Sequence, residues 1–122
     1  MYSRSHNCGE LRKSDNTKEV FLNGWVDKVR LHGKIVFIDL RDRYGKTQIV
    51  FDLDHFHGVF DEVKKLSMED VLSIQGKVRF RADSAINLKV KTGEIEVLVN
   101  KYILLNKAST LPFVLSDRQK SE

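Results

Sequence analysis

Five segments in which apolar residues recur at every second position constrain this chain more than any other feature. They lie at residues 18–31, 34–42, 47–53, 71–81 and 94–105, and two of them contain an interior glycine, Gly24 and Gly76. A period of two is typical of β-strands that bury one face, and a glycine inside a strand indicates a bulge or a sharp bend. The sequence therefore predicts five strands, each with a buried and an outer face.

The alternation also predicts which side chains point inward. Counting along each segment assigns these residues to the core: Val20, Leu22, Val26, Val36, Ile38, Leu40, Leu72, Ile74, Val78, Phe80, Ile95, Val97 and Val99. Phe37 and Arg79 fall at alternate positions and are expected on the outer face. In the last segment, we expect the register to shift near Lys101.

The period changes between the third and fourth strands. Apolar residues three and four apart predict a short amphipathic helix from Gly58 to Leu66. Three strands, a helix and two strands follow the order of the OB-fold, an all-β, five-stranded Greek-key barrel. A small β-sandwich is the main alternative, and the helix between strands three and four favours the barrel. We expect an N-terminal segment at 1–17, the barrel at 18–107 and a linker at 108–122.

Composition limits the class of protein. With 122 residues the chain has room for one domain but not for a complete two-substrate synthetase or kinase. The net charge of +4 permits a polyanionic partner without requiring one. A single cysteine, Cys8, excludes an internal disulfide framework and suits a reducing compartment, so we expect a cytoplasmic protein. No apolar run approaches the ~20 residues of a membrane span.

No residue pattern indicates catalysis. One cysteine cannot supply the paired thiolates of a usual zinc site. Four aspartates, Asp39, Asp42, Asp52 and Asp54, are expected to hold arginines in place, since neither a nucleophile elbow nor a phosphate loop accompanies them. We therefore predict no catalytic residue, no metal site and no cofactor in this chain.

The residues that favour a function lie around Phe37. An exposed aromatic on the second strand can stack on a nucleic-acid base, although a single surface aromatic is also common. Gln48 on the third strand carries an amide that both donates and accepts, which suits the Watson–Crick edge of an unstacked base. Basic residues surround this pair and are expected to attract a phosphate backbone: Lys28, Arg30, Lys34, Arg79 and Arg81.

Several motifs together resemble one family. They are Gly-Trp-Val at 24–26, Phe-Ile-Asp-Leu-Arg-Asp at 37–42, Thr-Gly-Glu-Ile-Glu-Val at 92–97 and Leu-Pro-Phe at 111–113. From about Cys8 to Phe113 the chain resembles the N-terminal anticodon-binding domain of bacterial-type aspartyl-tRNA synthetases. Asparaginyl-type and lysyl-type relatives share the first two motifs, whereas the last two are more specific.

The resemblance implies roles for single residues. Phe37 would stack on the middle anticodon base, a uracil, and Gln48 would read the edge of that base. Glu96 would face the first base, whose guanine donors suit a carboxylate, and Arg30 would face the third base, a cytosine.

Further residues take roles from the same resemblance. Arg79 and Arg81 match basic residues that contact the anticodon stem and loop, and His32 bears on discrimination at the third base. Of an Asn-x-Asn pair that the family commonly has, this chain keeps the second member, Asn87, whereas Ala85 replaces the first.

The resemblance also implies a larger enzyme. In that family a class II catalytic domain, which uses ATP and magnesium and forms most of a homodimer contact, follows the OB domain. Its motifs do not occur in this sequence, so we expect an isolated domain without catalytic activity that binds aspartate-type tRNA as a monomer or weak dimer. The alternatives are a general single-strand-binding OB domain and an OB module that binds proteins, for which Phe37 would be a hot spot.

Overall fold

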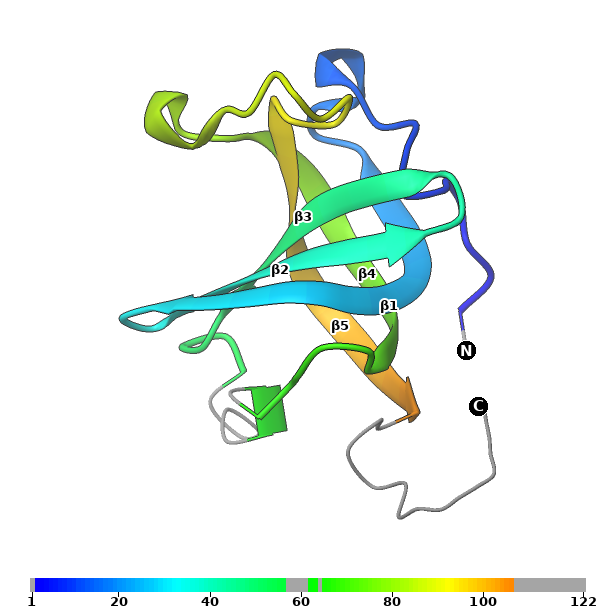
Figure 1. Ribbon diagram of the computed structural model, residues 1–122, viewed down its shortest axis with the longest axis vertical. Coiled ribbons are helices and arrows are strands. Elements are labelled where there is room, and N and C mark those ends of the chain that lie inside the picture. The colour runs from blue at the N-terminus through cyan, green and yellow to red at the C-terminus, as the bar shows by residue number, and fades with distance from the viewer. Residues whose placement is uncertain (1, 57–61, 64, 107–122) are drawn as a thin grey trace.

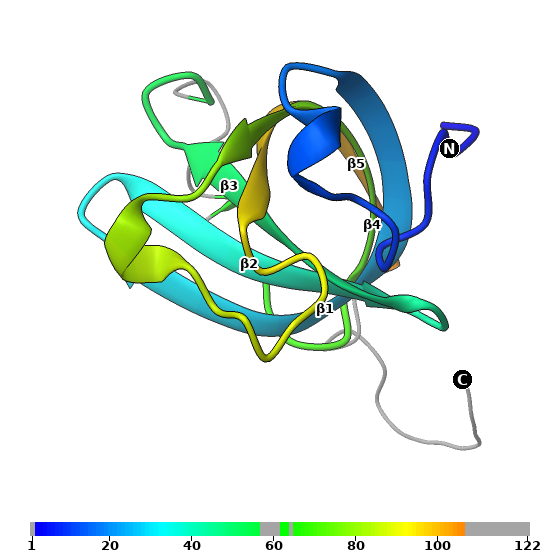
Figure 2. The same ribbon diagram turned by 90° about the horizontal axis from the view of Figure 1, so that it is seen from above.

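The computed structural model describes residues 2–56, 62–63 and 65–106. Five strands form a closed barrel in the order β1-β2-β3-β5-β4, which Figure 2 shows from above. Their bounds are β1 Glu19–His32, β2 Ile35–Asp42, β3 Gly45–Asp52, β4 Val71–Phe80 and β5 Ile95–Asn106 (Figure 1). Neighbouring strands are antiparallel except for β3 and β5, which are parallel. The predicted all-β OB barrel is confirmed, with strand ends within two residues of those expected.

Strand β1 passes from one partner strand to another at Trp25, directly after Gly24. Residues 19–25 pair with β4, and residues 25–32 pair with β2. A Cβ at Gly24 would lie 2.4 Å from the carbonyl oxygen of Arg41, so only glycine allows this close approach. Gly76 is equally crowded, because its Cβ would lie 2.5 Å from the carbonyl oxygen of Leu98. Both interior glycines thus mark positions where strands come unusually close.

The predicted core is confirmed with one exception. The residues assigned to the core on β1, β2, β4 and β5 are buried, except that Phe80 is 52% exposed. Phe80 is the last residue of β4 and pairs with Ile95, the first residue of β5. It therefore lies at the rim of the barrel, where the described residues leave half of its side chain uncovered, and the expectation that it points into the core was wrong. The expected register shift in β5 occurs at Asn100, between the pairs Gln75–Lys101 and Gly76–Val99.

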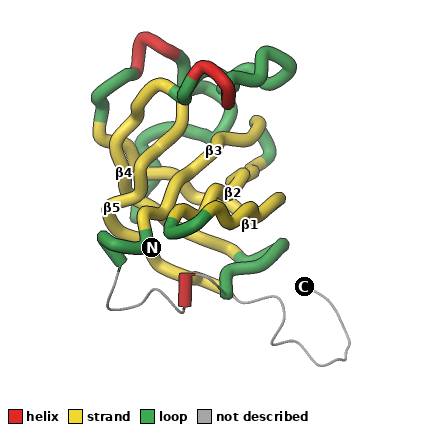
Figure 3. Tube along the Cα trace, turned by 90° about the vertical axis from the view of Figure 1, so that its left-hand side faces the viewer, coloured by secondary structure: helices red, strands yellow, loops and turns green. Residues whose placement is uncertain are grey.

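The predicted helix from Gly58 to Leu66 lies mainly outside the described residues, although Glu62 and Val63 are helical. The two short helical elements with defined bounds are 3-10 turns, η1 at Lys13–Asp15 and η2 at Asp83–Ala85. Figure 3 shows both at the same end of the barrel, and η2 connects β4 to β5 rather than β3 to β4. None of the helical turns in the described part of the chain has the length and apolar character needed to cross a membrane.

The segment before β1 packs against the barrel. Cys8 and Leu11 are fully buried and belong to the core. The backbone N–H of Cys8 donates to Asp42 Oδ2 at 2.8 Å, and Thr47 Oγ1 donates to the Cys8 carbonyl at 2.7 Å. Burial, reinforced by the nearby Asp42 carboxylate, raises the pKa of the Cys8 thiol. These contacts fix the segment on the β2–β3 hairpin.

Candidate nucleic-acid interface

A groove of about 640 Å³ lies between the outer face of the β1–β2–β3 sheet and the loop that joins β4 to β5. The β1–β2 hairpin and η2 project from the same side of the barrel (Figures 1 and 2), and residues of both line the groove. Seven of the nine predicted site residues line it: Lys28, Arg30, His32, Phe37, Gln48, Arg81 and Asn87. Side chains that are far apart in the sequence are thus brought to one concave surface.

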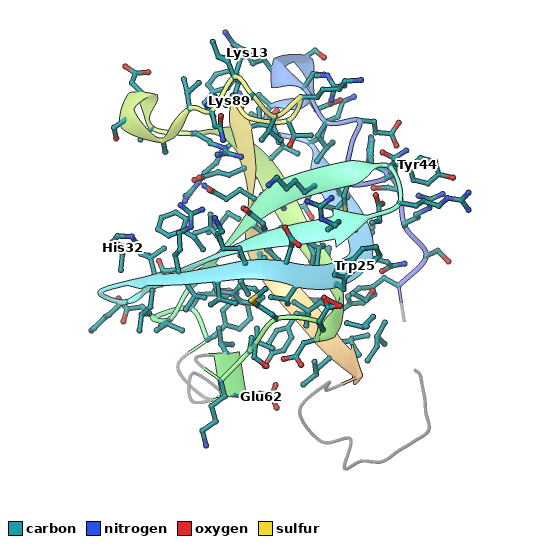
Figure 4. All side chains as sticks on the ribbon, in the orientation of Figure 1. Lys13, Trp25, His32, Tyr44, Glu62 and Lys89 are labelled. Carbon is teal, nitrogen blue, oxygen red and sulfur yellow. The ribbon has the colours of Figure 1, made fainter. Side chains whose placement is uncertain are left out.

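Phe37 points away from the core, as the alternation predicts. Its neighbours along β2, Val36 and Ile38, are buried in the core, whereas Phe37 is partly exposed and lines the groove. The His32 ring meets it edge-on with 5.8 Å between ring centroids, and the Arg30 guanidinium carbon lies 5.7 Å from its centroid. Figure 4 shows His32 near the tip of the β1–β2 hairpin. The groove therefore contains an aromatic ring with a cation beside it.

Gln48 is the centre of a side-chain network that crosses four strands. Its Oε1 accepts a hydrogen bond from Arg30 Nη2 at 2.8 Å, and its Nε2 donates to Glu96 Oε1 at 2.8 Å. Glu96 Oε2 in turn accepts from Arg79 Nε at 2.7 Å. Gln48 is only 3% exposed and Glu96 only 6%, so the network holds both side chains in fixed positions. Hydrogen bonds to charged groups in a partly dehydrated site are among the stronger ones.

The structure places two nearby arginines, Arg79 on β4 and Arg81 just after its end, in different surroundings. Arg79 does not line the groove, and its charge is paired with Glu96, which lies behind Gln48. Arg81 lines the groove and donates to two backbone carbonyl oxygens, those of Ile95 at 2.9 Å and Ala85 at 3.1 Å. Burial lowers the pKa of the Arg81 guanidinium, but an arginine stays charged at neutral pH. Arg81 therefore presents to the groove a positive charge that forms no ion pair with a carboxylate among the described residues.

The groove is electropositive. Among its described lining residues, four are basic, Lys28, Arg30, Lys46 and Arg81, and the one carboxylate is Asp39. Asp39 Oδ1 lies 3.8 Å from Arg30 Nη2, and Asp39 Oδ2 lies 4.0 Å from Lys46 Nζ. The expectation that this aspartate holds an arginine in place is confirmed, and an excess of positive charge remains for an anionic ligand.

Some lining residues were missed by sequence reasoning. Lys46 is two positions before Gln48 on β3, so alternation could have placed it on the outer face. Asp39, expected from the sequence only as a partner for an arginine, pairs with Gln48 across the hairpin and also lines the groove. The loop between β4 and β5 contributes three more lining residues, Ser84, Ala85 and Val90. This loop has no hydrophobic periodicity from which their positions could be predicted. Ala85, which stands where the resembling family commonly has Asn, contributes its carbonyl to Arg81.

Comparison with known proteins agrees with an OB barrel that carries an electropositive groove. Residues 20–105 match the model of a family described as "OB-fold nucleic acid binding domain". The chain belongs to this family. It is 45% identical over 120 residues to an aspartate–tRNA(Asp/Asn) ligase of Salinibacter ruber, covering 98% of this chain and 19% of the relative. A second such ligase, of Desulfatibacillum aliphaticivorans, is 47% identical over 114 residues, covering 93% and 19%.

The resemblance inferred from the motifs is thereby confirmed. The chain spans about a fifth of the length of these curated relatives. Among solved structures it is similar to asparaginyl-tRNA synthetase from Pyrococcus horikoshii, with a TM-score of 0.74 and 28% identity over 92% of this chain and 24% of that one. It is also similar to an OBody bound to hen egg-white lysozyme, with a TM-score of 0.71 and 26% identity over 88% of this chain and 98% of that one.

Proposed function

We propose that this chain recognises the anticodon loop of aspartate-type tRNA, as the anticodon-binding domain of an aspartate–tRNA ligase. The observation that carries the proposal is the groove in which Phe37 and Gln48 lie together within a ring of basic side chains. Stacking on an aromatic and hydrogen bonding to a base edge are the two contacts by which proteins read unpaired RNA bases. The similarity to aspartate–tRNA(Asp/Asn) ligases supports the choice of RNA.

In this proposal the middle anticodon base, a uracil, stacks on Phe37 and presents its Watson–Crick edge to Gln48. Glu96 already accepts hydrogen bonds on both carboxylate oxygens, so any contact with a guanine at the first position uses their remaining lone pairs. Arg30 lies beside Phe37 and faces the third base, close to His32. Arg81 and Lys28 contact phosphates, because neither charge forms an ion pair with a carboxylate in the part of the chain that the structure describes. Asn87 borders the RNA from the loop side.

The chemistry of the whole ligase is a separate part of the proposal. We assign three properties to the whole ligase: attachment of aspartate to tRNA, the use of ATP and magnesium, and assembly as a homodimer. This chain spans about a fifth of the length of such ligases among its relatives. The contribution of this chain is to select the tRNA and to position its anticodon arm.

Fluorescence anisotropy with short labelled RNAs tests the proposal. We expect the chain to bind an aspartate-type anticodon stem-loop more tightly than a stem-loop whose anticodon is scrambled. Equal affinity for both would indicate a general single-strand-binding domain. Binding to neither would favour a protein-binding module, a use of this fold that the OBody bound to lysozyme illustrates. Either of these outcomes contradicts anticodon recognition.

A further inference from the structure

We propose that Glu96 and Arg30 lock the orientation of the Gln48 amide, and that this lock makes the middle-base position selective for uracil over cytosine. The proposal rests on the anticodon recognition proposed above and deepens it. It assigns Glu96 and Arg30 a positioning role, and Arg79 a supporting one, that acts through Gln48 rather than through a contact with the middle base.

A glutamine side chain by itself discriminates poorly between these two bases. N3 of uracil carries a proton and donates, whereas N3 of cytosine has a lone pair and accepts. The amide has an acceptor on one side and donors on the other, and a half-turn about its terminal bond exchanges them. An amide that turns freely can therefore offer a complementary group to either base.

The neighbours of Gln48 remove this freedom. A guanidinium only donates, so the atom that lies 2.8 Å from Arg30 Nη2 has to be the amide oxygen. An ionised carboxylate only accepts, so the atom that lies 2.8 Å from Glu96 Oε1 has to be the amide nitrogen. A half-turn would face donor with donor on one side and acceptor with acceptor on the other. Two charge-assisted hydrogen bonds therefore fix a single orientation.

Arg79 and burial keep the Glu96 carboxylate and the Gln48 amide in position. The second oxygen of Glu96 accepts from Arg79 Nε at 2.7 Å, so the carboxylate cannot rotate without breaking an ion pair. Gln48 and Glu96 are both almost completely shielded from solvent, which leaves little room for water to replace either bond.

The locked amide still has one hydrogen-bonding position left on each atom. Oε1 has a second lone pair, and Nε2 has a second N–H. With the base held on Phe37, Oε1 accepts from N3–H of uracil and Nε2 donates to a neighbouring carbonyl oxygen of the same base. Cytosine in that place would set its N3 lone pair against Oε1. Discrimination thus follows from which atom of Gln48 is forced to face N3.

The test compares two matched substitutions, Glu96→Gln and Glu19→Gln. Glu19 also accepts a hydrogen bond from a glutamine, Gln75 Nε2, but this pair lies on β1 and β4, outside the groove lining. Affinities are measured for stem-loops that carry uracil or cytosine at the middle position and are otherwise identical. Any contact of Glu96 with the first base then cancels in the uracil-to-cytosine ratio.

We expect a wild-type ratio of roughly tenfold to a hundredfold, as for other two-point base contacts. Glu96→Gln should lower it at least about fivefold, because Arg79 takes the only oxygen of the new amide and an NH₂ group then faces Gln48. Glu19→Gln should leave the ratio unchanged. An unchanged ratio in Glu96→Gln overturns the proposal, as does a wild-type chain that binds the aspartate-type loop with no preference for uracil.

A second measurement needs no RNA and tests the fixed amide orientation even if the Glu96→Gln variant does not fold. In the free wild-type chain, we expect the NMR signals of the Gln48 side-chain NH₂ to show slow hydrogen exchange and a large separation of its two protons. Arg79→Met, which leaves the groove lining intact, should reduce both by releasing Glu96. Gln48 signals that match those of an exposed glutamine in the wild type overturn the lock, even if the tRNA proposal holds. Should the wild type bind neither RNA, anticodon recognition fails, and the NMR result alone decides whether the amide is locked.

Discussion

Phe37 and Phe51 lie on neighbouring strands of one hairpin, and their rings face opposite sides of the sheet. Phe51 is fully buried and packs against the rings of Phe56 and Tyr102, at centroid distances of 5.3 and 5.5 Å. Phe37 lines the groove beside Arg30 and His32. The same residue type therefore stabilises the barrel at one position and offers a surface for a ligand at the other. The comparison implies that stability and binding can be changed separately by substitutions on two adjacent strands of one hairpin.

Phe51→Ala should give the largest effect. Removing a fully buried aromatic leaves a cavity among Phe56, Tyr102 and their neighbours, and such changes typically cost about 3–5 kcal/mol of unfolding free energy. Urea denaturation followed by tryptophan fluorescence measures this. The fraction that remains folded should still bind RNA. A loss of stability below about 1 kcal/mol would show that the ring is not a core element.

Phe37→Ala should give a smaller effect of a different kind. Loss of a stacking contact is worth roughly 1–3 kcal/mol, which is about tenfold to a hundredfold in affinity for the aspartate-type stem-loop. The melting temperature should change little, because the ring lies outside the core cluster and its removal opens no interior cavity. Anisotropy and thermal melting on the same sample check both halves. A variant that melts much earlier would contradict the assignment of Phe37 to the outer face.

Lys28→Ala should change affinity less than Phe37→Ala and without regard to sequence. A lysine that contacts a phosphate releases about 0.7 of a counterion on a single strand, so the slope of log affinity against log salt should fall by roughly that amount. Lys101→Ala is the matched control, since Lys101 is exposed on β5 and does not line the groove. A change in the preference for uracil over cytosine would show that Lys28 does more than attract the backbone.

Cys8 provides the smallest signal and extends the comparison to the core. Its buried thiol has a raised pKa, so the reactive thiolate is scarce at neutral pH, and a thiol reagent should label the folded chain very slowly. Phe37→Ala should leave the labelling rate unchanged. Phe51→Ala should increase it, because labelling then proceeds through the more populated open state. Rapid labelling of the wild type would contradict the burial of Cys8.

Strand positions followed from the sequence because alternation is a local property. The parity that separated Val36 and Ile38 from Phe37 reflects the pleat of a strand, and the barrel confirms it. Phe80 shows the limit of that rule. Parity tells which side of a strand a residue occupies, but not whether the barrel continues far enough to cover that side.

The candidate site was predictable to the extent that it lies on strands. Phe37, Gln48 and Arg30 meet because strand register brings them together, and alternation placed Phe37 on the outer face. Arg30 has the parity of the core residues of β1, and it lines the groove because the register of that strand shifts between Val26 and Lys28. The hydrogen bond between Gln48 and Glu96 joins residues 48 positions apart across the closure of the barrel. No sequence pattern reports such a contact, because it depends on which strands become neighbours only after the barrel closes. The loop residues Ser84 and Val90 could not be predicted either, because their place in the groove depends on how the loop between β4 and β5 lies against the closed barrel.

The barrel closes between β3 and β5 through two residue pairs, Ile49–Val97 and Val50–Leu98. Side chains bridge the rest of this junction, since Gln48 donates to Glu96 and Thr92 Oγ1 donates to the carbonyl of Lys46. This junction has the fewest residue pairs of any between neighbouring strands, so we expect the amide protons of β3 and β5 that face it to exchange with solvent before those of β1 that pair with β4. A ligand that binds Gln48 only in the closed barrel stabilises the closed form by mass action. It therefore slows amide exchange along the β3–β5 junction, including at residues that it does not contact.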